Sequence, residues 1–194
     1  MTTPEALPRV RRVVTAIDGA GQSYIAEAGP SPAGFALPGS PFRSDNIWRT
    51  HAAPAPVDAP DDIAAHRGVL PPACGTVLRV IDFPPMEGTR EEQAALAAKV
   101  FALLYPDADH QAGSDRSAGM HTTDTVDYAI VLQGEIWAVM DRDEALLTAG
   151  DILIQRGTAH GWENRTDRMA RVAFVLIDAT RGGVGHENGT SPGR

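Results

Sequence analysis

Two histidines and an aspartate in the second half of the chain are the residues best suited to chemistry. His121 and Asp127 lie six positions apart with Thr123 between them, and His160 follows a turn at 156–158. Side chains alternate across a β-strand, so residues an even number apart share one face if the strand is unbroken. Two imidazoles and a carboxylate that converge suit Zn²⁺, Fe²⁺, Mn²⁺ or Ni²⁺ and leave coordination positions for water or substrate. We therefore expect a divalent metal on His121, Asp127 and His160.

The segment that carries these residues is expected to be a barrel or sandwich of short strands. Fifteen prolines and 19 glycines break the 194-residue chain into short pieces, as an all-β domain requires. Six strands at nearly even spacing, joined as antiparallel hairpins, are the simplest arrangement of the region 119–180. The expected strands span residues 126–132, 135–141, 144–147, 151–156, 160–164 and 169–178.

The region 1–118 is expected to add strands, covering loops and one helix that pack on this barrel core at 119–180. The run 90–104 is rich in Ala, Leu, Glu and Gln, which favours a helix. The tail 181–194 has little to bury and is predicted to be disordered, so the chain forms one structural domain. The helix face expected to pack contains Leu96, Val100, Leu103 and Leu104. Strands are expected at 10–18, 23–27, 46–52 and 76–83, with a covering loop at 30–41.

Both signature motifs of the cupin superfamily can be aligned with the barrel region. The first motif has two histidines, an acidic residue and a glycine, and the second has a glycine, Pro-x-Gly, a histidine and an asparagine. The first motif falls on His121, Thr123, Asp127 and Gly134, and the second on Gly150, Gln155, Gly157, His160 and Asn164. The chain thus resembles cupins, in particular small single-domain bacterial cupins of the cupin 2 type. The resemblance implies an all-β double-stranded β-helix, or jelly roll, over about sixty residues.

The chain departs from these motifs at two ligand positions. Thr123 takes the place of the second histidine, and Asp127 replaces glutamate and is shorter by one methylene. What remains resembles the 2-His-1-carboxylate triad of many non-haem iron oxygenases. The loss of one ligand of four lowers metal affinity without abolishing a site. The alternative is a degenerate, metal-free cupin in which both histidines form hydrogen bonds inside the barrel.

The resemblance does not name one function, because cupins include dioxygenases, decarboxylases, dehydratases, isomerases and binding proteins. We expect a metal-dependent enzyme, of the oxygenase or lyase class, acting on a small organic acid or polar metabolite. The competing possibility is a non-catalytic binder of small molecules. Arg79 is a candidate to bind a substrate carboxylate. Tyr128 alternates with apolar neighbours, which favours packing over the alternative role of a substrate contact, and Trp162 is a candidate pocket wall.

Composition and charge limit the partners of the chain. A formal charge of −8 argues against nucleic acid, and no window approaches the 18 consecutive apolar residues of a membrane span. The N-terminus lacks the apolar stretch of a secretory signal, and the single cysteine, Cys74, fits a reducing cytoplasm. The extra N-terminal strands predict a two-fold homodimer, or else a monomer in which they cover the chain's own sheet edges. The remaining histidines, expected to be solvated, are His51, His66, His110 and His186.

Overall fold

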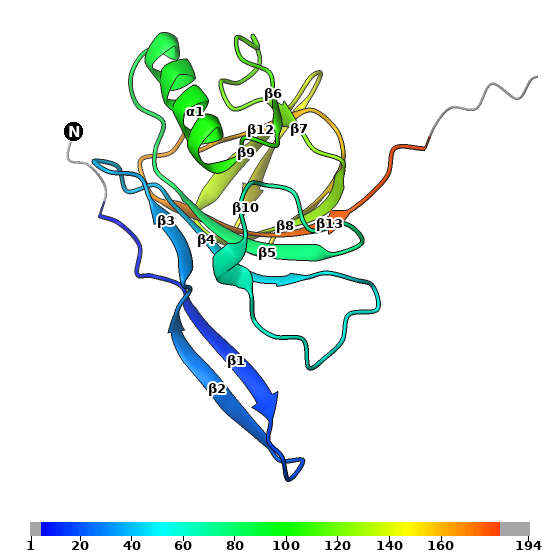
Figure 1. Cartoon of the computed structure of the whole chain (residues 1–194). Helices are drawn as coiled ribbons and strands as arrows, with labels where there is room; N and C mark the ends of the chain where they lie inside the picture. Colours follow the sequence, from blue (N-terminus) through cyan, green and yellow to red (C-terminus); the bar gives the residue numbers. More distant parts are fainter. Residues whose placement is uncertain (1–4, 183–194) are drawn as a thin grey trace, which may run out of the picture.

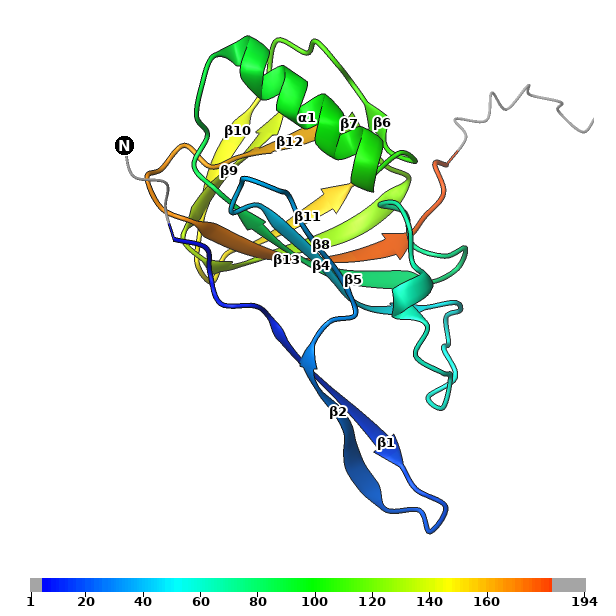
Figure 2. The ribbon, with the colours of Figure 1, turned by 60° about the vertical axis from the view of Figure 1, so that its left-hand side comes forward.

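The computed structural model describes residues 5–182, in which two antiparallel sheets face each other to form a barrel (Figures 1 and 2). The larger sheet has the order β11 (Ile152–Arg156), β8 (Thr125–Gln133), β13 (Ala170–Asp178), β5 (Thr76–Phe83), β4 (Arg43–Thr50) and β3 (Ala33–Ala36). The smaller sheet has the order β10 (Glu144–Thr148), β9 (Glu135–Met140), β12 (His160–Glu163), β7 (His121–Thr122) and β6 (Asp109–His110). This is the expected all-β double-stranded β-helix.

Most element boundaries agree with those expected from the sequence. The strand at 76–83 and the helix at 90–104 have the predicted limits, and the six strands expected in the region 119–180 lie within one residue of theirs. The structure adds a seventh strand there, β7, which was not expected. The expected covering loop at 30–41 instead contains β3. Its four residues, Ala-Gly-Phe-Ala, lack the β-branched types that mark a strand, and pairing with β4 overrides this weak local preference.

The barrel is built from both halves of the chain. Strand β13 pairs with β8 on one side and with β5 on the other, so β5, β4 and β3 continue the sheet that β8 and β11 begin. The region 1–118 therefore supplies three strands of the larger sheet. This matters for the site, because side chains of β5 and β4 reach the barrel interior.

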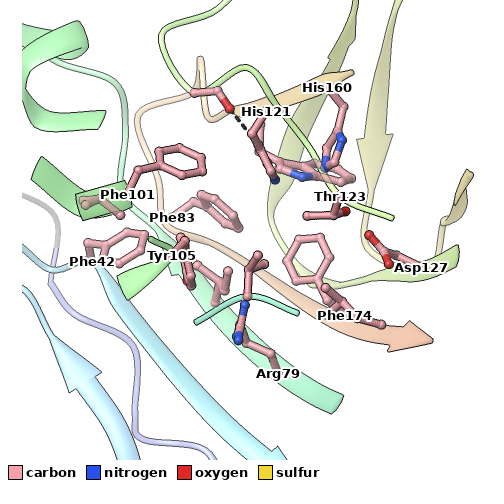
Figure 3. Close-up of a pocket in the computed structure, with 16 residues that line it drawn as sticks. Phe42, Arg79, Phe83, Phe101, Tyr105, His121, Thr123, Asp127, His160 and Phe174 are labelled. Atoms are coloured by element: carbon pink, nitrogen blue, oxygen red, sulfur yellow. Dashed lines mark hydrogen bonds between the residues drawn. The ribbon is translucent and has the colours of Figure 1, made fainter. Parts of the chain in front are cut away.

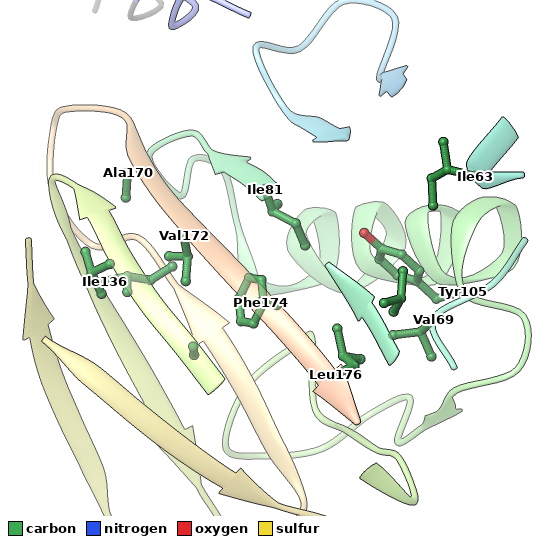
Figure 4. Close-up of a cluster of buried hydrophobic side chains, with 12 residues drawn as sticks. Ile63, Val69, Ile81, Tyr105, Ile136, Ala170, Val172, Phe174 and Leu176 are labelled. Carbon is green, nitrogen blue, oxygen red and sulfur yellow. The ribbon is translucent and has the colours of Figure 1, made fainter. Parts of the chain in front are cut away.

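Apolar side chains from both sheets fill the closed part of the barrel (Figure 4). Strand β13 provides Val172, Phe174 and Leu176 at every second position, as a strand with one buried face requires. Ile136 of β9 comes from the opposite sheet and is completely buried. The core therefore holds the two sheets together and leaves the other part of the barrel for a pocket.

The helix α1 (Arg90–Leu104) lies against the barrel beside β6 and β7 (Figure 2). A capping box joins the side chains and backbone of Thr89 and Glu92 at its start. None of its residues is fully buried, and its contacts with the core come from Val100, Phe101 and Leu104. Leu96 and Leu103, which were expected on the packing face, are 48% and 58% exposed. That expectation was wrong for these two residues, because the helix meets the barrel mainly through its last turn.

The strands β1 (Arg11–Ile17) and β2 (Ser23–Pro30) form the predicted hairpin, which projects from the barrel (Figures 1 and 2). Arg12 fixes its base through ion pairs with Glu27 (2.6 Å) and Asp61 (2.7 Å). A short 3₁₀-helix, η1 (Ile63–Ala65), precedes β5. Within residues 5–182, no helix is long and apolar enough to cross a membrane. Of the tail expected at 181–194, residues 183–194 lie outside the described part.

Candidate active site

A pocket of about 120 Å³ opens inside the barrel between the two sheets and α1 (Figure 3). Its walls are largely apolar, and Phe42, Phe83, Phe101, Trp162 and Phe174 are among the residues that line it. A dry apolar cavity of about 150 Å³ is large enough to bind benzene. The pocket is therefore suited to a small organic molecule with about one ring. The expectation that Trp162 forms part of the pocket wall is met.

His121 and His160 lie opposite each other on the neighbouring strands β7 and β12. Their ring centroids are 4.2 Å apart, and both rings line the pocket. Nδ1 of His121 donates to the carbonyl of Gly119 (2.9 Å), and Nδ1 of His160 donates to the carbonyl of Thr158 (3.0 Å). Because a carbonyl can only accept, the proton of each neutral ring lies on Nδ1, and each Nε2 carries a lone pair.

Burial keeps both rings neutral. Burial, together with the neighbouring His121, lowers the pKa of His160 to about 3. The pKa of His121 is also lowered, mainly by burial. Two imidazoles at this distance cannot both be charged without strong repulsion. At neutral pH the pair therefore offers two imidazole lone pairs, which can accept hydrogen bonds or bind a metal.

Thr123 and Asp127 reach the same pocket by a different route from the one expected. The strand is not unbroken, because β7 ends at Thr122 in one sheet and β8 begins at Thr125 in the other. The chain crosses between the sheets at 123–124, so the side chains turn inward without belonging to one continuous face. Thr123 is 4% exposed, and its hydroxyl lies 2.7 Å from that of Thr125.

Asp127 is a buried carboxyl group with an unused oxygen. It is 5% exposed, and its Oδ1 is buried without a hydrogen-bond partner among the described residues. Burial raises the pKa of Asp127 to about 6, although a hydrogen bond from Thr125 and the charge of Arg79 act in the opposite direction. A carboxyl group in this state can gain or lose a proton near neutral pH.

The predicted metal ligands share a pocket but not a coordination sphere. In the part of the chain that the structure describes, no three His, Cys, Asp or Glu side chains lie close enough together to hold one metal ion. Imidazole nitrogens and a carboxylate oxygen suit a transition metal, and Oδ1 of Asp127 has no hydrogen-bond partner among the described residues, so it is free to bind one. The positions of these side chains do not suit a three-ligand site, because only His121 and His160 are adjacent. The three-ligand site therefore stays a prediction.

Arg79 lies on β5 and is 2% exposed, at the end of the pocket away from the histidines in Figure 3. Its Nε donates to Oδ1 of Asn46 (2.7 Å), and its Nη2 donates to the carbonyl of Gly68 (2.7 Å). The guanidinium carbon lies 4.9 Å from the centre of the Tyr105 ring. Burial lowers the pKa of Arg79, but a guanidinium group stays charged in proteins. The second end of the pocket thus carries a permanent positive charge.

Sequence reasoning missed several residues near this charge. His66 was expected to be solvated, but it is 4% exposed and its Nε2 lies 3.4 Å from Nη2 of Arg79. That expectation was wrong, because a loop folds inward beside the guanidinium. Phe101 and Tyr105 reach the pocket from α1, and His110 stacks on Phe101 at 4.1 Å. The sequence signal that could have pointed to this part of the pocket is Arg79, a charged residue within the largely apolar run 76–83.

Tyr128 does not reach the pocket. It follows Asp127 on β8, and successive side chains of a strand point to opposite faces. Tyr128 is 42% exposed, and it is absent from the described residues that line the pocket. The structure therefore brings together His121, Thr123, Asp127, His160 and Arg79, and places Tyr128 on the outside of the barrel.

Comparisons with known proteins find sequence similarity to cupin-domain proteins. No family model matches it. The chain is 45% identical over 62 residues to phomopsin biosynthesis cluster protein D of Diaporthe leptostromiformis, which covers 31% of this chain and 33% of that protein. It is 27% identical over 179 residues to the cupin-domain-containing oxidoreductase fogC of Aspergillus ruber, which covers 89% of this chain and 74% of that protein. A cupin 2 conserved barrel domain protein from Salinispora arenicola has a TM-score of 0.40 and 18% identity, over 72% of this chain and 77% of that chain.

These relatives correct one detail of the resemblance. The curated proteins are fungal, so they do not support the expected kinship with bacterial cupins. The chain matches about a third of the length of the first of them. The sheet order, the motif residues inside the barrel and the extended match to a cupin-domain protein agree with one another. The chain has the cupin fold.

Proposed function

We propose that the chain is an enzyme that moves a proton to or from a small organic molecule bound in the barrel pocket. The observation that carries this proposal is Asp127, a buried carboxyl group with a free oxygen in a pocket that also holds two neutral imidazoles. Among the reactions of cupins, this arrangement favours isomerases, dehydratases and decarboxylases, in which proton transfer is central.

The two kinds of group differ in what they can do. A carboxyl group with a pKa of about 6 is largely ionised at neutral pH and still returns a proton readily. The neutral rings of His121 and His160 accept hydrogen bonds through Nε2. The largely apolar lining lowers the local dielectric, which strengthens each of these interactions. Asp127 is therefore the general base or acid in this proposal, and the histidines orient the reacting group.

Metal dependence is a second part of the proposal. It is favoured by the lone pairs on the two adjacent imidazoles, and two of the curated relatives are named as cupin-domain-containing oxidoreductases. A metal bound there would supply Lewis-acid or redox chemistry. The residues described above do not form a complete ligand set, so no step of the proton transfer depends on a metal.

The test is exchange of carbon-bound protons in D₂O, followed by ¹H NMR with 2-oxobutanoate and phenylpyruvate as probes. The protein should accelerate loss of the proton signals next to the carbonyl. Asp127→Asn should reduce this rate about a hundredfold or more, because a positioned base contributes on that order. Asp124→Asn is the matched control, since Asp124 is exposed and pairs with Arg181 outside the pocket.

Two outcomes would decide against this function. Exchange that is equally fast in Asp127→Asn contradicts the role of Asp127. Binding of the probes without any exchange favours the competing class, a small-molecule-binding protein that uses the same pocket without chemistry. Calorimetric titration alongside NMR separates these results.

We also propose that two chains form a two-fold dimer through the β1–β2 hairpin. An isolated two-stranded hairpin is marginally stable, and this one exposes Val13, Ile17 and Ile25. Sedimentation equilibrium at micromolar concentration should give twice the 20.6 kDa of one chain. Ile17→Lys combined with Ile25→Lys should shift the mass to one chain, whereas Ser23→Lys on the same hairpin should not. A wild-type mass of one chain would refute the dimer.

A further inference from the structure

Arg79 occupies an unusual place for a charged residue. It lies in the middle of β5, between β13 and β4, directly opposite Phe174 and Asn46 in the two neighbouring strands. Its side chain is directed into the barrel and is 2% exposed. A buried charge is very costly unless it is paired and hydrogen-bonded. The position of Arg79 therefore requires an account of its partners.

The partners of Arg79 are all neutral. Its Nε and Nη2 donate to the oxygens of Asn46 and Gly68, and Nη2 also lies 3.4 Å from Nε2 of His66. No carboxylate of the described residues lies within 4.0 Å of its nitrogens. The charges of Asp107 and Asp127 act on Arg79 from beyond that distance, and the carboxylate of Asp107 accepts hydrogen bonds from the backbone nitrogens of Val69 and Leu70.

Another buried arginine of the same chain shows what a compensated charge looks like. Arg12 is 4% exposed, and it pairs with the carboxylates of Glu27 at 2.6 Å and Asp61 at 2.7 Å. Arg171 likewise pairs with Asp82 at 2.6 Å. Arg79 is more deeply buried than either and lacks such a pair. The difference is that Arg79 faces a pocket.

The pocket also limits what can approach this charge. The aromatic rings of Phe83 and Phe174 line its middle, and the space is about 120 Å³. Tyr105 flanks the guanidinium, and its hydroxyl donates to Ser44 at 2.9 Å, which holds the ring in place. An anion that reaches Arg79 must therefore be small and must carry an apolar body. A guanidinium binds a carboxylate through two parallel hydrogen bonds, which no neutral group reproduces.

We propose that Arg79 is the anion-binding residue of this pocket and that the ligands are small carboxylic acids with a single ring or an equally compact apolar body. The carboxylate lies on Arg79, the ring lies between the aromatic walls, and the far end of the ligand faces Asp127, His121 and His160. This inference rests on the proposed function for the chemistry at the far end, and it names the substrate class of that site.

The test compares pairs of ligands that differ in charge and little in shape: benzoate with benzamide, and phenylacetate with phenylacetamide. Calorimetric titration of the wild-type chain should show each acid binding about tenfold or more tightly than its amide, since a hydrogen bond to a charged group contributes about 1.5–3 kcal/mol. This comparison needs no variant, so it stands even if substitutions at Arg79 impair folding.

Variants then assign the preference to one residue. Arg79→Met should remove the difference between acid and amide while the amide still binds, and Arg79→Lys should retain part of it. Arg49→Met is the matched control, because Arg49 lies on the neighbouring strand, pairs with Asp62 and does not line the pocket. Far-ultraviolet circular dichroism checks that each variant is folded.

Equal affinities of acid and amide for the wild-type chain would overturn the inference, as would an acid preference that survives in folded Arg79→Met. The first of these results would mean that Arg79 only supports the loop at Gly68. The outcomes are distinct from failure of the proposed function. If the chain prefers acids but does not catalyse proton exchange, the proposed enzymatic function is overturned and the anion-binding role of Arg79 stands. If it catalyses exchange without preferring acids, the enzymatic function stands and the role of Arg79 is overturned.

Discussion

The two ends of the pocket bury ionisable groups in opposite ways. At the histidine end, His121 and His160 lose their protons, and the cost of burial appears as a lowered pKa. At the arginine end, Arg79 cannot lose its proton, so it stays charged and donates hydrogen bonds to neutral oxygens of Asn46 and Gly68. A buried group that can titrate avoids the cost of a buried charge by becoming neutral, without help from another group. A guanidinium stays charged, so it needs another residue or a ligand to compensate its charge. This difference makes the arginine end the place to look for a ligand's charge.

The largest expected effect on this comparison is the loss of stability in acid. Burial lowers the pKa of His160 to about 3, and burial with the charge of Arg79 lowers the pKa of His66 to about 4. Both values lie below the usual 6.5, so the unfolded chain binds more protons below pH 6.5 and the folded state loses stability as the pH falls. At pH 5 each histidine should cost about 2 kcal/mol relative to pH 7 or above.

Urea unfolding at pH 7 and pH 5 measures this loss. His160→Gln and His66→Gln should each remove about 2 kcal/mol of the difference between the two pH values, because glutamine does not titrate. His51→Gln is the control, since His51 is exposed. Asp127 opposes the trend, because its raised pKa of about 6 makes the folded state more stable as the pH falls from about 6 to 4. A pH dependence unchanged in both histidine variants would mean that neither ring is held neutral by burial.

The sequence predicted the histidine end far better than the arginine end. His121, Thr123, Asp127 and His160 fall in two short motifs, and their spacing survives any uncertainty about the rest of the chain. The prediction nevertheless assumed an unbroken strand from His121 to Asp127, and the chain crosses between sheets there. Motif spacing fixes which residues face the barrel, but it does not fix the distances between them.

The sequence singled out Arg79 itself, but the residues around Arg79 could not be predicted because they are distant along the chain. Arg79 meets Asn46 of β4, the loop at Gly68 and Tyr105 at the end of α1. No local pattern links these positions: strand pairing places Asn46 beside Arg79, whereas the loop at Gly68 and Tyr105 reach it through tertiary packing. The apolar run around Arg79 predicted a strand correctly, and only the barrel decides that this charge points inward.

A smaller expected effect concerns Thr123, which lines the pocket at the position where the cupin motif has its second histidine. Thr123→His should complete a third imidazole beside His121 and His160 and tighten binding of Zn²⁺ or Ni²⁺ by about tenfold or more, which is the usual scale for ligand-sphere changes. The larger ring also replaces the hydroxyl that contacts Thr125, so a loss of about 1–2 kcal/mol in stability should accompany the gain.

Competition with a chromophoric chelator measures the affinity. Thr122→His is the matched control, because Thr122 is the neighbouring residue and does not line the pocket. If Thr123→His and Thr122→His bind metal equally, the histidine end does not present its imidazoles to a common point, and the contrast between the two ends would then lie in charge alone.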